Sequence, residues 1–156
     1  MVPIADLLDE KLVAWRLHGD TKEAVIAELV DLVAAAGLAR NRDEALGTVL
    51  ARERTVSTGL ENGVAIPHGK TDAVNRLVVA LGLKPEGLDF ASLDAQPSRI
   101  FVLTLSPLAD TGPHIQFLAT MSKLLRRADV RDALLTAPDA AAVIAGLLTA
   151  AAAVKR

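Results

Sequence analysis

The chain has 156 residues, of which 51% are apolar, and its 17 basic and 19 acidic side chains give a formal net charge of −2. A chain of this length suits one domain, so we expect residues 1–156 to form a single domain with one hydrophobic core. The balanced charge gives no basis for binding nucleic acid or an anionic membrane surface. Cysteine is absent, which excludes disulfides, thiolate nucleophiles and cysteine-ligated metal ions.

No part of the chain is expected to insert into a membrane. The longest uncharged apolar run covers residues 140–154, and its 15 residues are mostly alanine. A membrane-spanning helix needs roughly 20 apolar residues. The N-terminus carries acidic side chains early and lacks the basic start of a signal peptide. We therefore expect a protein that works in the cytoplasm.

Capping patterns predict two helices in the first third of the chain. A capping box, Asp-Thr-Lys-Glu, opens with Asp20 as the N-cap and predicts a helix over residues 21–36. Gly37 is expected to end this helix in a left-handed conformation. The same pattern beginning at Asn41 predicts a second helix over about residues 42–53.

Strands are predicted before these helices and in the middle of the chain. Residues 12–18 and 64–67 suit short strands. The runs 77–83 and 100–105 are almost continuously apolar, which is typical of strands covered on both faces. The connection over residues 84–99 has no strong helical pattern, so a mixed sheet is expected rather than a purely parallel one.

The last third of the chain predicts three helices. Thr111 or Gly112 is expected to cap a helix with Pro113 at its first position, continuing over residues 114–127. Two more helices should follow, at about residues 129–136 and 139–154. Helices, then strands, then helices predict an α/β fold, a three-layer sandwich with a central mixed β-sheet flanked by helices.

His68 has the most distinctive setting of the three histidines, in the segment STGLENGVAIPHGKT. Pro67 fixes its own φ and holds Ile66 extended, so a strand leads directly into His68. Gly69 has no side chain and would let an anion approach the ring. An isolated Pro-His-Gly tripeptide also suits a turn whose histidine only makes local hydrogen bonds. His18, by contrast, is expected to be a solvated loop residue.

Two further residues favour phosphoryl chemistry at His68. His114 lies in the first turn of a predicted helix, where exposed amides and the helix dipole favour an anion. Arg52 lies in the helix before the glycine-bearing loop. Either residue alone suits an ordinary structural role. Together, they would allow His68 to carry a phosphoryl group whose oxygens are bound by His114 and offset by Arg52.

The segment RERTVSTGLENGVAIPHGK resembles the active-site segment of the enzyme IIA domains of the bacterial phosphoenolpyruvate-dependent phosphotransferase system. The type is the fructose/mannitol type, which includes the nitrogen-regulatory IIA proteins. The segments TKEAVIAELVDLVAAAG, DAQPSRIFVLTLSP and HIQFLATMSKLLRRADVRDALLTA are also similar to that family, so the resemblance covers about Leu7 to Leu148.

This resemblance implies that His68 is the phosphorylated residue, that His114 is the second active-site histidine and that Arg52 is the active-site arginine. It implies an HPr-like phosphocarrier as donor, an enzyme IIB domain with an acceptor cysteine, a mixed sheet between helical layers, and neither a metal nor an organic cofactor. A role in sugar uptake is favoured slightly. The alternative is a nitrogen-regulatory protein that signals by its phosphorylation state and binds regulatory target proteins.

Two other classes of function stay open on the residues alone. A metal-dependent hydrolase would use His68 and His114 as ligands, but it needs a third ligand, and the chain has no HxH or HExxH spacing. A pure interaction module with an inactive site would not accept a phosphoryl group. For a phosphocarrier, an apolar collar around His68 is expected, with Leu60, Val64 and Ile115 as candidates.

Overall fold

Two long strands, β4 (Val78–Leu88) and β5 (Ser98–Ser106), pair antiparallel in a computed structural model that describes residues 3–154. Three short strands complete the sheet, and each runs parallel to its partner. These are β1 (Val13–Ala14) beside β4, and β2 (Val64–Ala65) and β3 (His68–Lys70), both beside β5. The sheet is therefore mixed, as predicted.

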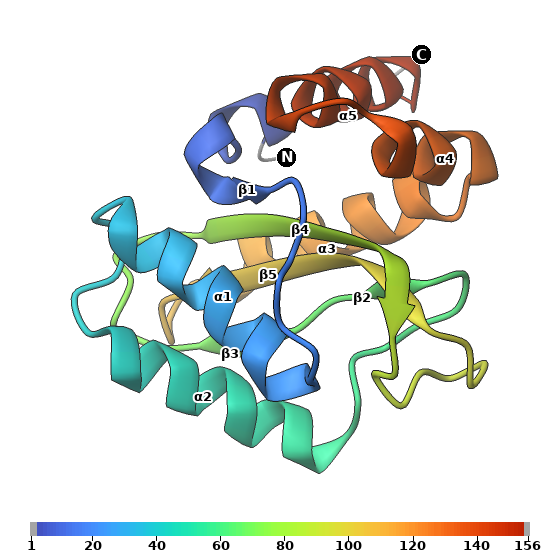
Figure 1. Cartoon of the computed structure of the whole chain (residues 1–156). Coiled ribbons are helices and arrows are strands. Elements are labelled where there is room, and N and C mark those ends of the chain that lie inside the picture. Colours follow the sequence, from blue (N-terminus) through green and yellow to red (C-terminus); the bar gives the residue numbers. More distant parts are fainter. Residues whose placement is uncertain (1–2, 155–156) are drawn as a thin grey trace.

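Helices cover both faces of this sheet (Figure 1). Helices α1 (Lys22–Ala35) and α2 (Arg42–Thr55) pack on one face, where α1 contacts β4 and α2 contacts β3. Helices α3 (Thr111–Leu125) and α4 (Ala128–Thr136) pack on the other face. The prediction of a three-layer α/β sandwich is confirmed.

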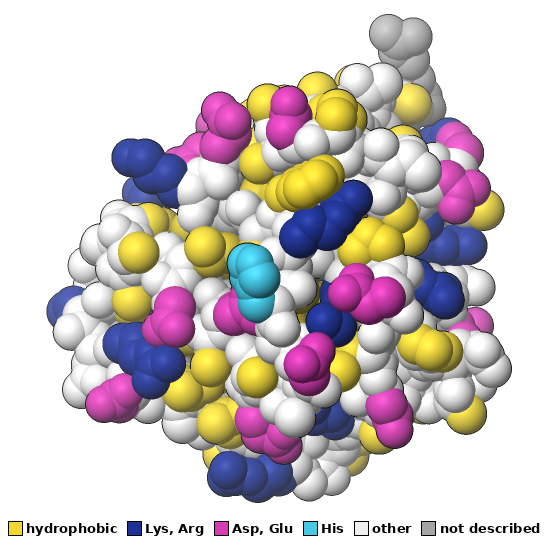
Figure 2. Space-filling view, viewed as in Figure 1, with side chains coloured by type: hydrophobic (Ala, Val, Ile, Leu, Met, Phe, Trp, Pro, Cys, Tyr) yellow, Lys and Arg dark blue, Asp and Glu magenta, His cyan; other side chains and the backbone are white. Residues whose placement is uncertain are grey.

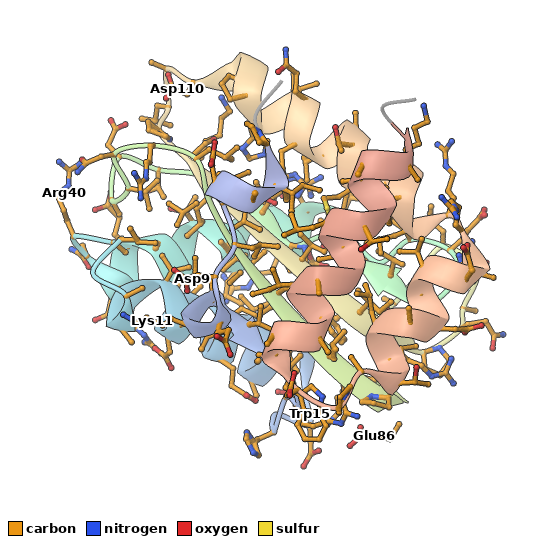
Figure 3. All side chains as sticks on the ribbon, turned by 90° about the horizontal axis from the view of Figure 1, so that it is seen from above. Asp9, Lys11, Trp15, Arg40, Glu86 and Asp110 are labelled. Atoms are coloured by element: carbon orange, nitrogen blue, oxygen red, sulfur yellow. The ribbon has the colours of Figure 1, made fainter. Side chains whose placement is uncertain are left out.

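Helix α5 (Ala140–Val154) lies outside this layer, against α4 and two short 3₁₀ helices, η1 (Ile4–Asp6) and η2 (Glu10–Leu12). Figure 3 shows α5 beside α4, with the N-terminal segment next to it. The indole Nε1 of Trp15 donates a 2.7 Å hydrogen bond to the Ala137 carbonyl and so links the segment after β1 to the turn between α4 and α5. None of the helices described within residues 3–154 is long and apolar enough to cross a bilayer.

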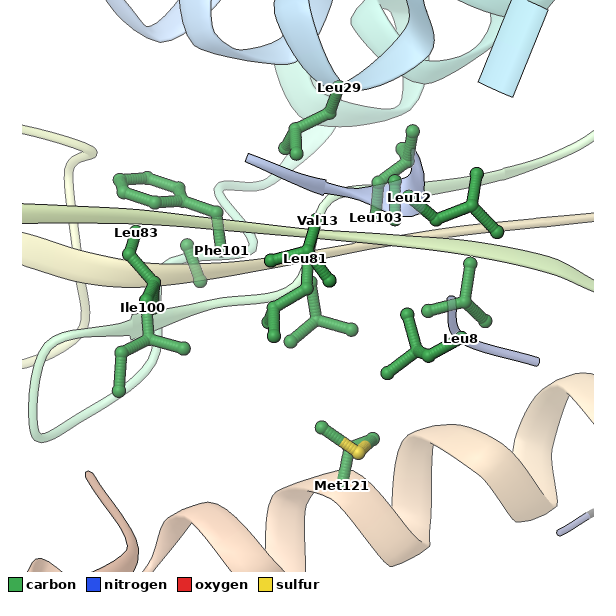
Figure 4. Packing of buried hydrophobic residues seen from close by; sticks show 14 of the residues in the cluster. Leu8, Leu12, Val13, Leu29, Leu81, Leu83, Ile100, Phe101, Leu103 and Met121 are labelled. Carbon is green, nitrogen blue, oxygen red and sulfur yellow. The ribbon is translucent and has the colours of Figure 1, made fainter. Parts of the chain in front are cut away.

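The core fills the space on both sides of the sheet. Figure 4 shows Leu29 of α1 on one side and Met121 of α3 on the other, with Leu81 and Phe101 in the strands between them, and all four side chains are fully buried. A sheet buried on both faces needs apolar residues at successive positions, because neighbouring side chains point to opposite faces. This explains why β4 and β5 are almost continuous apolar runs.

Helix caps follow the predictions in part. Asn41 caps α2, since its side chain accepts a 3.0 Å hydrogen bond from the Glu44 amide. Gly37 follows α1 with a φ of +74°, the left-handed conformation expected after a helix. The prediction of Asp20 as the N-cap of α1 is wrong. Thr21 is the cap, and its Oγ1 accepts from the Ala24 amide at 3.1 Å.

The start of α3 also differs from the prediction. The helix begins at Thr111, so Pro113 is its third residue and not its first. Proline is tolerated there because the first amides of a helix have no partner within the helix. Asp110, the residue before the helix, makes no side-chain capping hydrogen bond. The local sequence therefore gives little indication of the boundary.

We expect Leu29→Ala to lower the free energy of unfolding by about 3 kcal/mol, because it leaves a cavity between α1 and the sheet. Leu93→Ala is the matched control, since Leu93 is 74% exposed. It should change stability by less than about 0.5 kcal/mol. The free energy of unfolding of both variants is measured by urea titration, with the fluorescence of Trp15, the single tryptophan of the chain, as the signal. Equal losses in the two variants would contradict the described packing.

Candidate functional site

His68 is the first residue of β3, and its ring lies on the face of the sheet that α3 covers. It pairs with Thr104 of β5, and Lys70 pairs with Ser106. Gly69 lies between them and faces α2, where a Cβ atom would come within 3.0 Å of the Thr48 side chain. Since strand residues alternate between faces, His68 and Lys70 point away from α2. Close packing on α2 is thus a structural reason for this glycine, and access for an anion stays a prediction.

The tautomer of His68 is fixed by the backbone. Its Nδ1 lies 2.7 Å from the carbonyl oxygen of Ile66. A carbonyl oxygen can only accept, so Nδ1 carries the proton and donates. In the neutral ring, Nε2 then holds the free lone pair and points away from this contact. The local hydrogen bond and a nucleophilic role, which the sequence offered as alternatives, are compatible with each other.

His114 lies on α3 directly opposite, as the two-histidine hypothesis requires. The centroids of the His68 and His114 rings are 5.5 Å apart, and the ring planes meet at 69°. His114 is only 4% exposed, and its Nδ1 shares a 2.6 Å hydrogen bond with Oγ of Ser106. One nitrogen is thus occupied by the protein, which leaves Nε2 of His114 as the remaining polar atom of the ring.

Burial keeps His114 uncharged near neutral pH. Desolvation, followed by the nearby His68 and then Lys70, lowers the pKa of His114 from 6.5 to about 4. Lys70 stands close because its Nζ donates a 2.7 Å hydrogen bond to Oγ1 of Thr111, one helical turn before His114. A neutral imidazole has one donor and one acceptor nitrogen, so His114 can donate a hydrogen bond without carrying charge.

Arg52 lies in the last turn of α2, at the end of β3 where His68 begins. Helix α2 runs antiparallel alongside β3, since Thr71 Oγ1 donates to Glu44 at 3.4 Å and Thr48 packs on Gly69. Arg52 is one turn beyond Thr48 on the same side of the helix. Its Nη1 donates a 2.9 Å hydrogen bond to the Val56 carbonyl. In this structure the guanidinium therefore binds the backbone at the end of α2 and neither histidine.

The structure corrects part of the apolar collar that was expected around His68. Val64 belongs to the core and is buried, so its proposed place in the collar is wrong. Ile115, next to His114, is 59% exposed, and Leu60 is half-buried. His18 is exposed, as predicted, and its Nδ1 lies 3.5 Å from Glu28. Within residues 3–154, no three or more His, Asp or Glu side chains gather in a way that could hold a metal ion.

Several residues near the histidines were missed by sequence reasoning. Ser106 and Lys70 reach the site from adjacent strands, and Oγ1 of the neighbouring Thr104 is buried without a hydrogen-bond partner. The sequence did contain one indication of them, because residues 104 and 106 are hydroxyl residues at alternate positions of an otherwise apolar strand and so share one face of the sheet. Figure 2 shows acidic and basic side chains intermixed on the face that it presents, in keeping with the balanced net charge.

The fold is that of bacterial IIA proteins. The structure matches the nitrogen-regulatory protein IIA-Ntr from Neisseria meningitidis with a TM-score of 0.84, at 27% identity over 92% of this chain and 98% of that chain. It matches IIA mannitol from Escherichia coli with a TM-score of 0.77, at 22% identity over 90% and 98% of the two chains. The second likeness is one of fold alone.

The sequence comparisons identify the family. The chain is 42% identical over 117 residues to a fructose-specific EIIA component from Haloferax volcanii, covering 75% of this chain and 76% of that protein. It is 34% identical to a nitrogen regulatory protein from Pseudomonas aeruginosa over 92% and 93% of the two chains. Residues 6–149 match the family of the phosphoenolpyruvate-dependent sugar phosphotransferase system, EIIA 2. The chain belongs to this family and is a phosphotransferase component.

The lowered pKa of His114 makes stability depend on pH. Below pH 6.5 the unfolded chain binds more protons at this residue than the folded chain does. The free energy of unfolding is therefore unaffected by His114 above pH 6.5, and it decreases as the pH falls towards about 4. The loss can reach roughly 3 kcal/mol. We expect His114→Asn, which keeps an amide near Ser106, to flatten this pH dependence in urea unfolding. His18→Asn should not, and parallel curves for wild type and His114→Asn would contradict the prediction.

Proposed function

We propose that Nε2 of His68 accepts a phosphoryl group from an HPr-like phosphocarrier and passes it to a cysteine of an enzyme IIB domain. The observation that carries this proposal is the hydrogen bond from Nδ1 to Ile66, which leaves Nε2 free beside a second, neutral histidine. One similar structure is a complex of IIA mannitol with phosphorylated IIB mannitol from Escherichia coli. The family and this geometry support the same chemistry.

In the first transfer, the lone pair of Nε2 forms the new N–P bond while the N–P bond of the donor histidine breaks. The His68 ring becomes positively charged as it gains the phosphoryl group. Its proton stays on Nδ1 and is hydrogen-bonded to the Ile66 carbonyl, which stabilises that charge. In the second transfer, a cysteine thiolate attacks phosphorus and the neutral ring leaves. No proton has to move to or from His68 in either step, because Nδ1 keeps its proton throughout.

His114 and Arg52 are proposed to stabilise the phosphoryl oxygens. When Ser106 donates to Nδ1 of His114, the Nε2–H of His114 is available to donate across the short gap to His68. Arg52 would turn from the Val56 carbonyl and bind two oxygens with its planar fork. Phosphoryl transfer depends mainly on such positioning and charge stabilisation. No metal or organic cofactor is part of this proposal.

For the physiological role we propose sugar uptake, served by residues 1–156 as one cytoplasmic domain. The identity of 42% to a fructose-specific EIIA component supports it. A nitrogen-regulatory role with protein targets is the second candidate, supported by the TM-score of 0.84 to IIA-Ntr and by near full-length similarity to a nitrogen regulatory protein. Transfer from the phosphorylated protein to a fructose-type IIB domain would favour uptake, whereas absence of that transfer would favour regulation.

Phosphoryl uptake from phosphoenolpyruvate, enzyme I and HPr, read by intact mass, tests the nucleophile. Wild type should gain one acid-labile phosphoryl group, and His68→Ala should gain none while still folding. Arg52→Ala and His114→Ala should slow uptake about a hundredfold, because each removes a group that stabilises transferred charge. His18→Ala is the control histidine and should behave as wild type. Uptake by His68→Ala would show that the nucleophile has been assigned to the wrong residue.

A further inference from the structure

Glu53 is a buried carboxylate that the proposed transfer chemistry does not use. It is 5% exposed and follows Arg52 in the last turn of α2. Its carboxylate accepts from the Thr58 amide at 2.9 Å, from Thr58 Oγ1 at 2.6 Å and from Lys22 Nζ at 2.9 Å. Every described contact of this carboxylate therefore comes from α1 or from the loop after α2.

This buried ion pair is costly to build. The Glu53 side chain is only 3% exposed and that of Lys22 is 21% exposed, so the carboxylate leaves water almost completely and the ammonium leaves it in part. Such pairs add little net stability compared with apolar residues of similar size. The structure surrounds the pair with further contacts, since Lys22 also lies 4.6 Å from the centre of the Phe90 ring. A closely packed and fully paired network at this cost is better explained by the geometry that it imposes on the loop.

The loop connects Glu53 to His68 by consecutive hydrogen bonds. Thr58, held at its amide and hydroxyl by Glu53, presents its carbonyl to the Ile66 amide at 3.0 Å. The carbonyl of Ile66 in turn accepts a 2.7 Å hydrogen bond from His68 Nδ1. The backbone position of Ile66 thus depends on Thr58, and the position of Thr58 depends on Glu53.

We propose that Glu53, paired with Lys22, is a positioning residue for His68: it anchors Thr58, which orients Ile66 and so maintains the proton on Nδ1 and the lone pair on Nε2. This inference rests on the proposed function in naming Nε2 as the reactive atom. The tautomer itself is a property of the resting protein, and it can be measured without any phosphoryl transfer.

Glu53→Gln is the first test. The amide has one acceptor oxygen in place of two, so a donor of Thr58 or Lys22 loses its partner and the lysine loses its counter-charge. The His68 tautomers are read from imidazole ¹⁵N shifts at about pH 8, where an ordinary histidine is neutral. The ratio of the Nδ1–H to the Nε2–H form should fall about fivefold, the factor for one hydrogen bond of ordinary net strength. Phosphoryl uptake should slow roughly tenfold or more, since the ring is misplaced.

The control is Glu61→Gln, the same change at an exposed glutamate of the same loop, which should leave the tautomer ratio at the wild-type value. Thr58→Val removes one bond to Glu53 but retains the Lys22 ion pair, and the same ¹⁵N measurement on it decides the matter if Glu53→Gln does not fold. A folded Glu53→Gln or Thr58→Val protein with the wild-type tautomer ratio would overturn the proposal, even with a lowered melting temperature. A shifted ratio in the variant, when the wild-type protein also takes up no phosphoryl group, would support the positioning role and count against the proposed function.

Discussion

The hydrogen bond between His68 Nδ1 and the Ile66 carbonyl is the contact on which the site depends. It spans Pro67, whose ring fixes φ and removes an amide that would otherwise compete for partners. The Pro67 carbonyl accepts from the Thr104 amide at 3.1 Å, so the turn is tied to β5 on the other side as well. A ring held in this way does not need to search for its reactive orientation, which lowers the entropic cost of the transfer step.

The alternation of side chains in β3 separates the chemistry from the packing. His68 and Lys70 face α3 and meet His114 and Thr111, while Gly69 faces α2 and allows that helix to approach closely. The same alternation places Thr104 and Ser106 of β5 under the histidines. Polar groups therefore gather on one face of an otherwise apolar sheet. Thr104, Ser106 and His114 are buried there, while His68 and Lys70 are partly exposed.

Much of the fold could be predicted from sequence because the signals are local. The apolar runs of β4 and β5 and the cap at Asn41 follow from patterns within a few residues. The setting of His68 was recognised for the same reason. Register is not local, so the pairing of β3 with β5 and the contact of Ser106 with His114 could not be predicted. Val64 was misplaced because an apolar residue near a site gives no indication of which face it occupies.

The ring nitrogen that carries the phosphoryl group is the most direct measurement to make. Protein labelled with ¹⁵N at histidine would be phosphorylated and examined for ³¹P–¹⁵N coupling at His68. Coupling to Nε2, with the Nδ1 proton retained, is the expected result, because the Ile66 carbonyl occupies Nδ1. Coupling to Nδ1 would mean that this hydrogen bond breaks during transfer, and the proposed basis for the reactivity of His68 would be wrong.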